Sequence, residues 1–186
     1  MIWFTADFHL AHKNIIQYCQ RPFANIEEMD TVILDNFSER VEPGDTLYFL
    51  GDLTFKANVA TQFFERFKDI QIHFIIGNHD STEVIELARK YCVNVAHLKD
   101  VTINNQAITL CHYAMRVWNK SHYNAWQLYG HSHGKLASVG KQHDVGVDNN
   151  IFTPISFEKL VKIMKGKANN VNYIGEKRGK MIGTDE

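Results

Sequence analysis

The sequence has little of several features that would narrow its class at once. Its three cysteines, Cys19, Cys92 and Cys111, are odd in number and widely spaced, which does not resemble a disulfide framework or a zinc ribbon and favours reduced thiols. No apolar run approaches the roughly 18 residues of a membrane span. The start, MIWFTADF, lacks the basic residue and long apolar run of a signal peptide. We therefore expect a cytoplasmic protein with no membrane partner.

Charge of either sign is not in excess. Lys and Arg number 20 against 21 Asp and Glu, which gives a net charge of −1 with histidine neutral. Such a balance produces no global field that would favour nucleic acid. The Lys-rich stretch 159–180 is a local exception, which we interpret as a solvated helix face and tail. The sequence says nothing about the oligomeric state.

What the sequence does contain is a series of short apolar runs that each end at polar residues. Runs of this length rich in Ile, Phe, Tyr and Leu are typical of buried strands. The runs are IWFT (2–5), TLYFL (46–50), IHFII (72–76), AITLC (107–111) and WQLY (126–129).

Helical periodicity fills the early gaps and returns near the end. Apolar residues recur on one face of 26–40 and 57–68, and serines are candidate N-caps for helices over 82–91 (Ser81) and 156–165 (Ser156). Alternating strands and helices followed by closer-spaced strands predict α/β layers around mixed sheet. We expect one domain over 1–165 and a C-terminal tail over 166–186, partly mobile.

Polar residues at the ends of the strands form the candidate site. In α/β sheets, ligands gather at the carboxyl ends of strands, and residues two apart on an extended segment point to the same side. Carboxylate, amide and imidazole groups without thiolate suit Mn²⁺, Fe, Zn²⁺, Co²⁺ or Ni²⁺. There are enough ligands for two ions, and ions about 3.5–4 Å apart need a bridging carboxylate, for which Asp52 is the candidate. The residues concerned are Asp7, His9, Asp52, Asn78, His79, His112, His131 and His133.

Each of these residues also has an ordinary interpretation. Asp52 and Asn78 could be turn residues, His112 a satisfied core or surface histidine, and His131 with His133 part of a plain polar loop. The metal site is favoured because all of these coincidences would have to occur together and in the right order.

The ordered blocks D-x-H, G-D, G-N-H-D, H and G-H-S-H over residues 7–133 resemble the calcineurin-like metallophosphoesterase superfamily. HxxHKN, RPF and DVGVD are similar to a small bacterial and phage branch of it, one without an assigned substrate. The resemblance implies a four-layer α/β/β/α sandwich and two divalent metal ions, with manganese favoured. It implies one ion held by Asp7, His9, Asp52 and His133, and another by Asp52, Asn78, His112 and His131.

The resemblance also implies a catalytic role for His79, which would donate a proton to the leaving oxygen or stabilise the phosphoryl charge. Asp80 would orient His79 and keep more of it protonated, since a nearby carboxylate raises the pKa of an imidazole. The implied activity is phosphoester hydrolysis, because two cations neutralise phosphate charge and lower the pKa of a bound water.

One departure concerns the substrate. Many relatives continue G-D as GDxxD or GDxxDR, whereas this chain reads GDLTFK. Without that arginine, we expect phosphodiesters or nucleotide-like substrates rather than phosphoproteins. The alternatives are a nuclease acting on RNA or DNA, which the neutral charge does not favour, and a non-catalytic binding scaffold, against which the presence of His79 argues.

Further residues are candidates for substrate binding or support. His12, Arg21 and Arg116 could reach a substrate phosphate, although helix-surface packing or solvated loop charge explains them as well. Asp144 and Asp148 could support His131 or His133 from behind, and a turn role is an equal alternative for Asp148.

Overall fold

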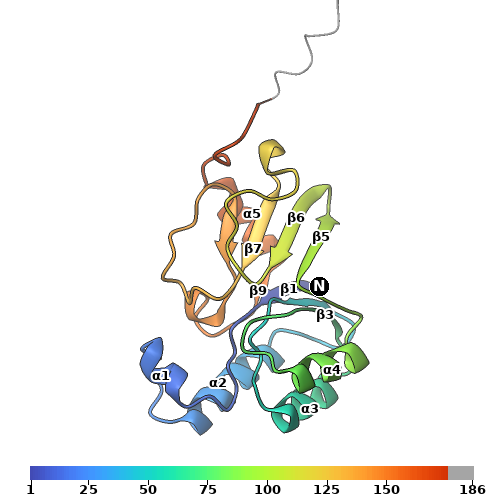
Figure 1. Cartoon of the computed structure of the whole chain (residues 1–186), viewed down its shortest axis with the longest axis vertical. Helices are drawn as coiled ribbons and strands as arrows, with labels where there is room; N and C mark the ends of the chain where they lie inside the picture. Colours follow the sequence, from blue (N-terminus) through green and yellow to red (C-terminus); the bar gives the residue numbers. More distant parts are fainter. Residues whose placement is uncertain (176–186) are drawn as a thin grey trace, which may run out of the picture.

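Two β-sheets form the centre of the computed structural model, which describes residues 1–175 (Figure 1). The first sheet has the order β4-β3-β2-β1-β9, in which β1 to β4 are parallel and β9 is antiparallel to β1. Its strands are β1 (Ile2–Thr5), β2 (Thr46–Phe49), β3 (Gln71–Ile75), β4 (Asn94–Ala96) and β9 (Ile155–Ser156).

The second sheet has the order β5-β6-β7-β8, with β5 antiparallel to β6 and the other neighbours parallel. Its strands are β5 (Leu98–Ile103), β6 (Gln106–Cys111), β7 (Trp126–Tyr129) and β8 (Gln142–Asp144). A parallel bridge between Ala6 and Gly146 joins the segments that follow β1 and β8. The two sheets are therefore connected beside the predicted site.

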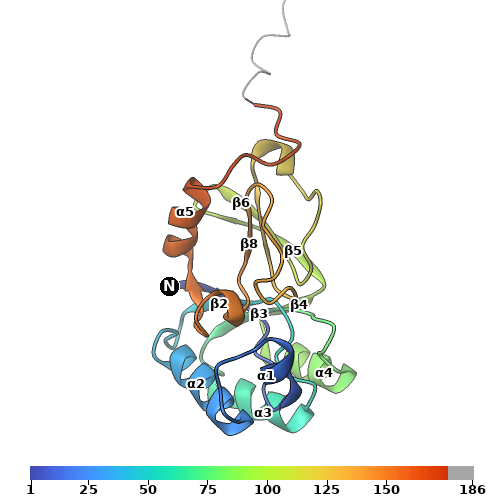
Figure 2. The same cartoon turned by 90° about the vertical axis from the view of Figure 1, so that its left-hand side faces the viewer.

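Helices cover the first sheet on one side, and α5 packs beside both sheets (Figure 2). The caps expected for α4 and α5 are confirmed: Ser81 accepts a hydrogen bond from Val84 N–H, and Ser156 accepts one from Lys159 N–H. The helices are α1 (Asn14–Tyr18), α2 (Ile26–Ser38), α3 (Ala57–Arg66), α4 (Thr82–Tyr91) and α5 (Phe157–Lys165), with 3₁₀ turns η1 (Ser121–Tyr123) and η2 (Val147–Asn149).

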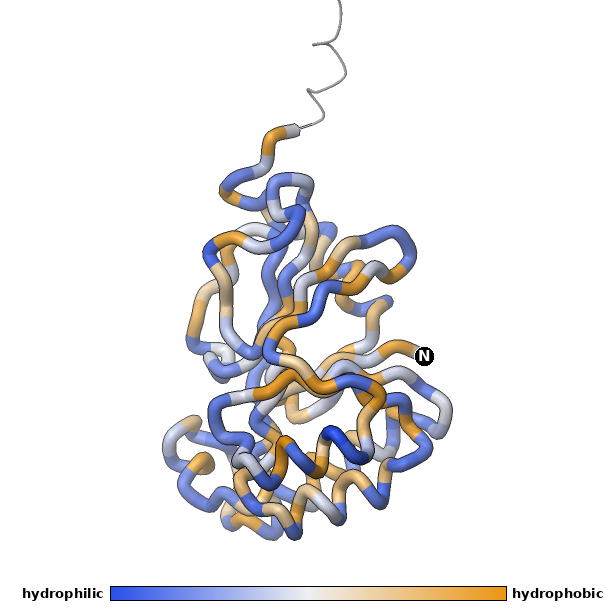
Figure 3. The backbone as a smooth tube through the Cα atoms, turned by 45° about the vertical axis from the view of Figure 1, so that its right-hand side comes forward, coloured by the Kyte–Doolittle hydropathy of each residue, from blue (hydrophilic) through white to orange (hydrophobic). Residues whose placement is uncertain are grey.

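Two hydrophobic cores hold these layers together. One lies between the first sheet and α2 to α4 and is rich in phenylalanine, with Phe37, Phe49 and Phe64 fully buried. The other joins the inner faces of the two sheets and α5, where Leu50 and Leu128 are fully buried. Apolar and polar segments alternate along the helices of the first layer (Figure 3), as expected for helices with one buried face.

The predicted α/β sandwich class is confirmed, with one local difference. The face of the second sheet that points away from the first carries Gln127, whose amide contacts Met115 N–H and Tyr113 O in the loop after β6. That face is therefore covered by a loop, while α5 packs against the inner face. Within residues 1–175, no helix combines the length and apolar character needed to cross a membrane.

The predicted C-terminal tail is described only as far as residue 175, and 176–186 lie outside the described residues. In the described part, Asn170 is buried, and its Nδ2 donates to Ser121 O and Ala125 O at 2.8 and 3.0 Å. This segment packs on the loop before β7.

Candidate metal centre

The residues expected to hold metal follow strands of both sheets and come together in two groups. Ligand atoms of Asp7, His9 and His133 lie within 4.8 Å of one another, and so do those of Asp52, His112 and His131. In the first sheet, the contributing segments follow β1, β2 and β3; in the second, they follow β6 and β7. The structure thus places these side chains at one junction of the two sheets.

Asp52, a member of the second group, also faces the first. Its Oδ2 is 3.4 Å from His9 Nε2 and 3.3 Å from His112 Nε2, while its Oδ1 accepts a 2.8 Å hydrogen bond from His79 N–H. One oxygen therefore faces both groups, as a bridging ligand would.

Buried polar atoms without partners indicate that this cluster fits cations. Within the described residues, both ring nitrogens of His9 and Oδ2 of Asp52 are buried and make no hydrogen bond. A buried polar group left unpaired costs about 1–3 kcal/mol, and a divalent ion would satisfy Asp52 Oδ2 and the His9 Nε2 that faces it at 3.4 Å. The donor set is nitrogen and oxygen, which suits Mn²⁺, Fe or Zn²⁺.

Other contacts orient the imidazoles. His112 Nδ1 lies 2.7 Å from Leu50 O, which leaves its Nε2 facing Asp52 and Asn78. Asn78 Oδ1 is 2.9 Å from His131 Nδ1 and 3.1 Å from His112 Nε2, so it lies among the ligands of the second group. Fixing one ring nitrogen so that the other faces inward is typical of metal-binding histidines.

Asp148 orients His133 in the same way. Its Oδ2 is 2.7 Å from His133 Nδ1, so the support expected from Asp148 is present in the structure. Asp144 acts on the loop instead: it accepts hydrogen bonds from Ser132 Oγ–H, Gly134 N–H and Gly146 N–H.

Several of the same positions have a left-handed backbone. Positive φ is uncommon for residues other than glycine, and such strain clusters at functional sites. Five of the seven expected ligands have positive φ: Asp7 (61°), His9 (52°), Asp52 (60°), His131 (65°) and His133 (48°).

Glycine is required where the ligand segments approach one another. A Cβ on Gly77 would collide with Asp52 Oδ1, and one on Gly130 would lie 2.7 Å from Asp7 Oδ2. The glycines of the GNHD and GHSH blocks therefore leave room for carboxylates of other strands.

Burial and neighbouring charge set the electrostatics of the site. Burial raises the pKa of Asp7 to about 7 and lowers that of His9 to about 3. Burial also opposes ionisation of Asp52, but the close approach of His112 Nε2, at 3.3 Å, outweighs it and lowers the pKa of Asp52 to about 2. In His133, burial is outweighed chiefly by the bond to Asp148, which raises the pKa to about 10. Metal binding would displace the protons from such groups.

His79 lies exposed beside the first group, with its ring centroid 5.1 Å from that of His9. Asp80 has a position different from the expected one. Its carboxylate accepts three hydrogen bonds from backbone N–H groups, of Asp52 and Leu53 at 3.0 Å and of Gly77 at 2.8 Å. Asp80 therefore fixes the two loops that carry Asp52 and His79, rather than the imidazole of His79. Burial raises its pKa to about 6, against the effect of these bonds.

The three residues expected to bind substrate lie in three different surroundings. The His12 ring centroid is 6.0 Å from that of His79, so His12 is close to the site. Arg21 is buried, and its guanidinium donates to both oxygens of Asp148 and to the carbonyls of Asp7 and Phe8. Its donors are used inside the protein, so it holds ligand segments and does not face a substrate. Arg116 is exposed and lines a separate hollow with Trp118 and Leu136.

Three aromatic residues beside the site were missed in the sequence. Tyr113 has its ring centroid 4.8 Å from that of His131, and Phe55 and Tyr18 lie 5.1 and 6.3 Å from His12. The available signal was position alone, since Tyr113 follows His112 directly and Phe55 comes three residues after Asp52.

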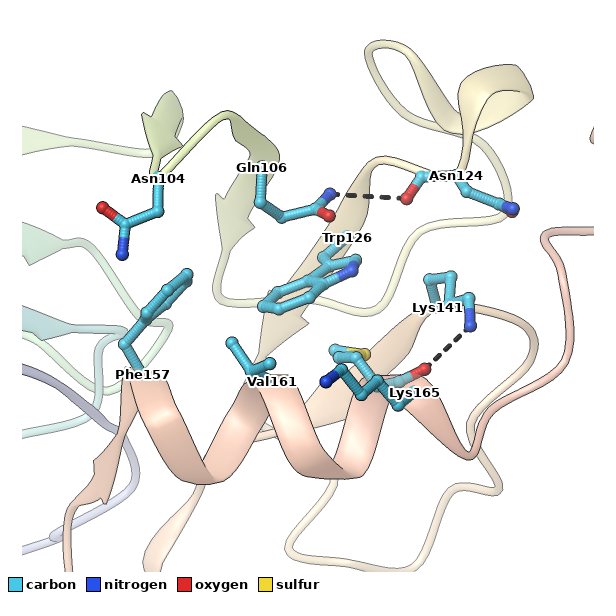
Figure 4. Close-up of a pocket in the computed structure, with 9 residues that line it drawn as sticks. Asn104, Gln106, Asn124, Trp126, Lys141, Phe157, Val161 and Lys165 are labelled. Carbon is cyan, nitrogen blue, oxygen red and sulfur yellow. Dashed lines mark hydrogen bonds between the residues drawn. The ribbon is translucent and has the colours of Figure 1, made fainter. Parts of the chain in front are cut away.

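A cavity of about 470 Å³ lies away from this cluster, between α5 and the ends of β5, β6 and β7 (Figure 4). Trp126, Phe157 and Met164 give it an apolar wall, and Lys141 at its edge donates a 2.7 Å hydrogen bond to Met164 O. None of its lining residues is an expected site residue, so chemistry rather than cavity size identifies the site.

Comparison with known proteins agrees with the fold. Residues 1–144 match the calcineurin-like phosphoesterase family, and the chain belongs to that family. It is 31% identical over 176 residues to the uncharacterized protein MJ1445 of Methanocaldococcus jannaschii, covering 89% of this chain and 93% of that protein.

Solved structures with the same fold include the protein of unknown function AQ665 from Aquifex aeolicus, with 23% identity and a TM-score of 0.67. The match covers 88% of this chain and 98% of that chain. Yfce, a phosphoesterase from E. coli, matches with 19% identity and a TM-score of 0.46 over 78% of this chain and 77% of its own.

Proposed function

We propose that the protein is a phosphoester hydrolase that uses two divalent metal ions, with manganese as the favoured metal and phosphodiesters or nucleotide-like compounds as substrates. The observation that supports this most is the position of Asp52 Oδ2, 3.4 Å from His9 and 3.3 Å from His112, buried and without a hydrogen bond within the described residues. A lone carboxylate oxygen facing two groups of ligands suits a pair of ions better than one.

The residues of the site would have different roles in hydrolysis. Asp7, His9 and His133 would hold one ion and Asn78, His112 and His131 the other, with Asp52 shared. Two such ions supply charge neutralisation for the phosphate and an activated water. His79 is exposed beside His9, which suits donation of a proton to the leaving oxygen as the ester bond breaks. His12, next to His79, would contact the phosphate or the leaving group.

Metal depletion and reloading test the proposal. Chelator-treated protein is reloaded with Mn²⁺, its metal content is measured by mass spectrometry, and hydrolysis of bis-para-nitrophenyl phosphate is followed. We expect two ions per chain and hydrolysis that depends on them. Failure to hydrolyse diesters with Mn²⁺, Ni²⁺ or Co²⁺ despite full loading would favour a binding scaffold instead.

Variants separate the roles of the residues. Asp52→Ala should lose metal, because it removes the shared ligand. His79→Ala should keep both ions but lose about 10²- to 10⁴-fold in kcat, the usual contribution of a general acid. His97→Ala, which removes an exposed histidine that follows β4, is the matched control and should behave as the native protein. Near-native turnover in His79→Ala would rule out its role as the acid.

A further inference from the structure

Exposed aromatic side chains border the proposed metal centre at both ends. Tyr113 is 46% exposed, and its ring centroid is 4.8 Å from that of His131 and 5.1 Å from that of His112. Phe55 is 42% exposed, and its ring lies 5.1 Å from that of His12. Single exposed aromatic residues are common on proteins, but here they adjoin one site.

The two aromatic residues adjoin different ligand groups of the proposed metal centre. Tyr113 contacts the histidines of the second ligand group, whereas Phe55 contacts His12, whose ring is 5.6 Å from that of His9 in the first group. Asp52, in the second group, also faces the first. A phosphate held at the centre would therefore have one aromatic residue on each side.

Positive charge accompanies the Phe55 end. Lys56 Nζ is 5.9 Å from the Phe55 ring centroid, and Lys135 Nζ donates a 2.9 Å hydrogen bond to the backbone carbonyl of Tyr18. The Tyr18 ring is 61% exposed and lies 6.3 Å from His12. Aromatic faces together with lysines are what proteins use to bind bases linked by phosphates.

We propose that Phe55 and Tyr113 are stacking platforms for the two arms of a phosphodiester, so that the substrates are short nucleotidyl diesters with a flat group on each arm. This proposal rests on the proposed hydrolase function. One water is consumed: its oxygen bonds to phosphorus, the P–O bond to the leaving arm breaks, and the leaving oxygen takes a proton. For a dinucleoside monophosphate, the products are a nucleoside and a nucleoside monophosphate.

The position of His79 sets the direction of the substrate. His79 adjoins His12, which adjoins Phe55, so the leaving arm lies on the Phe55 side. The arm that stays on the phosphate then lies on Tyr113. The two residues should accordingly respond to different parts of the substrate.

Two esters with the same leaving group test this assignment. Thymidine 5′-(para-nitrophenyl phosphate) has a flat group on both arms, and methyl para-nitrophenyl phosphate has one on the leaving arm only. Steady-state kinetics are measured for Mn²⁺-loaded native protein, Phe55→Ala and Tyr113→Ala, with metal content checked in each. Tyr123→Ala, which removes a 54% exposed tyrosine in η1, is the control.

We expect Tyr113→Ala to raise KM for the thymidine ester alone by about 5- to 100-fold, the usual effect of losing one stacked base. Phe55→Ala should raise KM for both esters. In each case kcat should stay within about twofold, and Tyr113→Trp should restore the native KM. The control should match the native protein.

The possible failures are distinguishable. Native protein that hydrolyses both esters with the same KM, and variants that match it, would overturn the stacking proposal while leaving the hydrolase intact. Loss of kcat with unchanged KM would also overturn it, because stacking acts on binding. Absence of any hydrolysis by fully loaded native protein would instead reject the proposed function.

Discussion

Replacing Asp148 by asparagine is the most informative single change to the support of the site. Asp148 receives two hydrogen bonds from Arg21, each 2.8 Å long, and lies 2.7 Å from His133 Nδ1. The Arg21 side chain is fully buried. An asparagine at this position would have nearly the same shape, but it would leave the guanidinium without its counter-charge. Its NH₂ group, a donor, would replace an acceptor oxygen that now faces Arg21 or His133.

The size of the effect follows from this burial. Removing one member of a buried ion pair costs about 3–5 kcal/mol, a large part of the roughly 5–15 kcal/mol that stabilises a typical domain. Because the support of His133 is also lost, the affinity for metal should fall about 10- to 100-fold. Urea unfolding gives the first quantity, and Mn²⁺ titration gives the second. Glu86→Gln, which breaks an exposed ion pair with Arg89, should change stability by no more than about 1 kcal/mol.

A double-mutant cycle decides whether the reasoning is right. Arg21→Gln and Asp148→Asn should be strongly coupled, because each removes the partner of the other. A loss below about 1 kcal/mol in Asp148→Asn, or free energies that simply add in the double variant, would refute the view that this buried pair fixes the site.

Other predictions concern packing, reactivity and pH. Gly77→Ala should abolish metal binding because its Cβ would meet Asp52 Oδ1, whereas Gly166→Ala, with 3.6 Å to its nearest neighbour, should bind metal normally. Burial raises the pKa of Cys92 to about 12, so alkylation of this thiol at pH 8, followed by mass spectrometry, should be slow in the native state and fast in urea. Burial raises the pKa of Asp7 to about 7 from 3.8. In chelator-treated protein, its contribution to the free energy of unfolding is therefore complete below pH 3.8 and disappears as the pH rises through 7. Asp7→Asn should remove that part of the pH dependence of unfolding, and an unchanged profile would contradict this prediction.

Much of the fold was predictable because local signals agreed. The apolar runs before Asp7, Asp52, Asn78, His112 and His131 are strands, and they end where the polar residues begin. Since parallel strands place their carboxyl ends at one edge, the polar residues after them were expected to lie together, whereas their division into two ligand groups was implied by the resemblance to the family.

The elements that were missed depend on tertiary contacts. Strand β5, with the sequence LKDVTI, buries only Ile103, and β8 consists of Gln142, His143 and Asp144. Gln142 is buried because its amide bonds to Gln127 and Met115, which no periodicity reveals. Polar segments of this kind form strands because they pair with neighbouring strands and pack against them.

Contacts between distant residues explain the unexpected positions within the site. Arg21 resembles a phosphate-binding residue in sequence, yet its partner Asp148 is brought to it by the fold. Asp80 is adjacent to His79 in sequence, but its oxygens point toward N–H groups of the loop that carries Asp52. Neighbours in sequence need not be partners in space, and here His79 and Asp80 lie at a turn after β3, where the direction of each side chain depends on the fold.

Metal ions bound at the junction of the two sheets would also stabilise the fold. Asp52 follows a strand of the first sheet and His112 a strand of the second, so ions bound there would cross-link the two sheets. Ligand binding to the folded state alone stabilises it by mass action. The supply of divalent ions in the cell would then set how long each molecule survives proteolysis, as well as how fast it works.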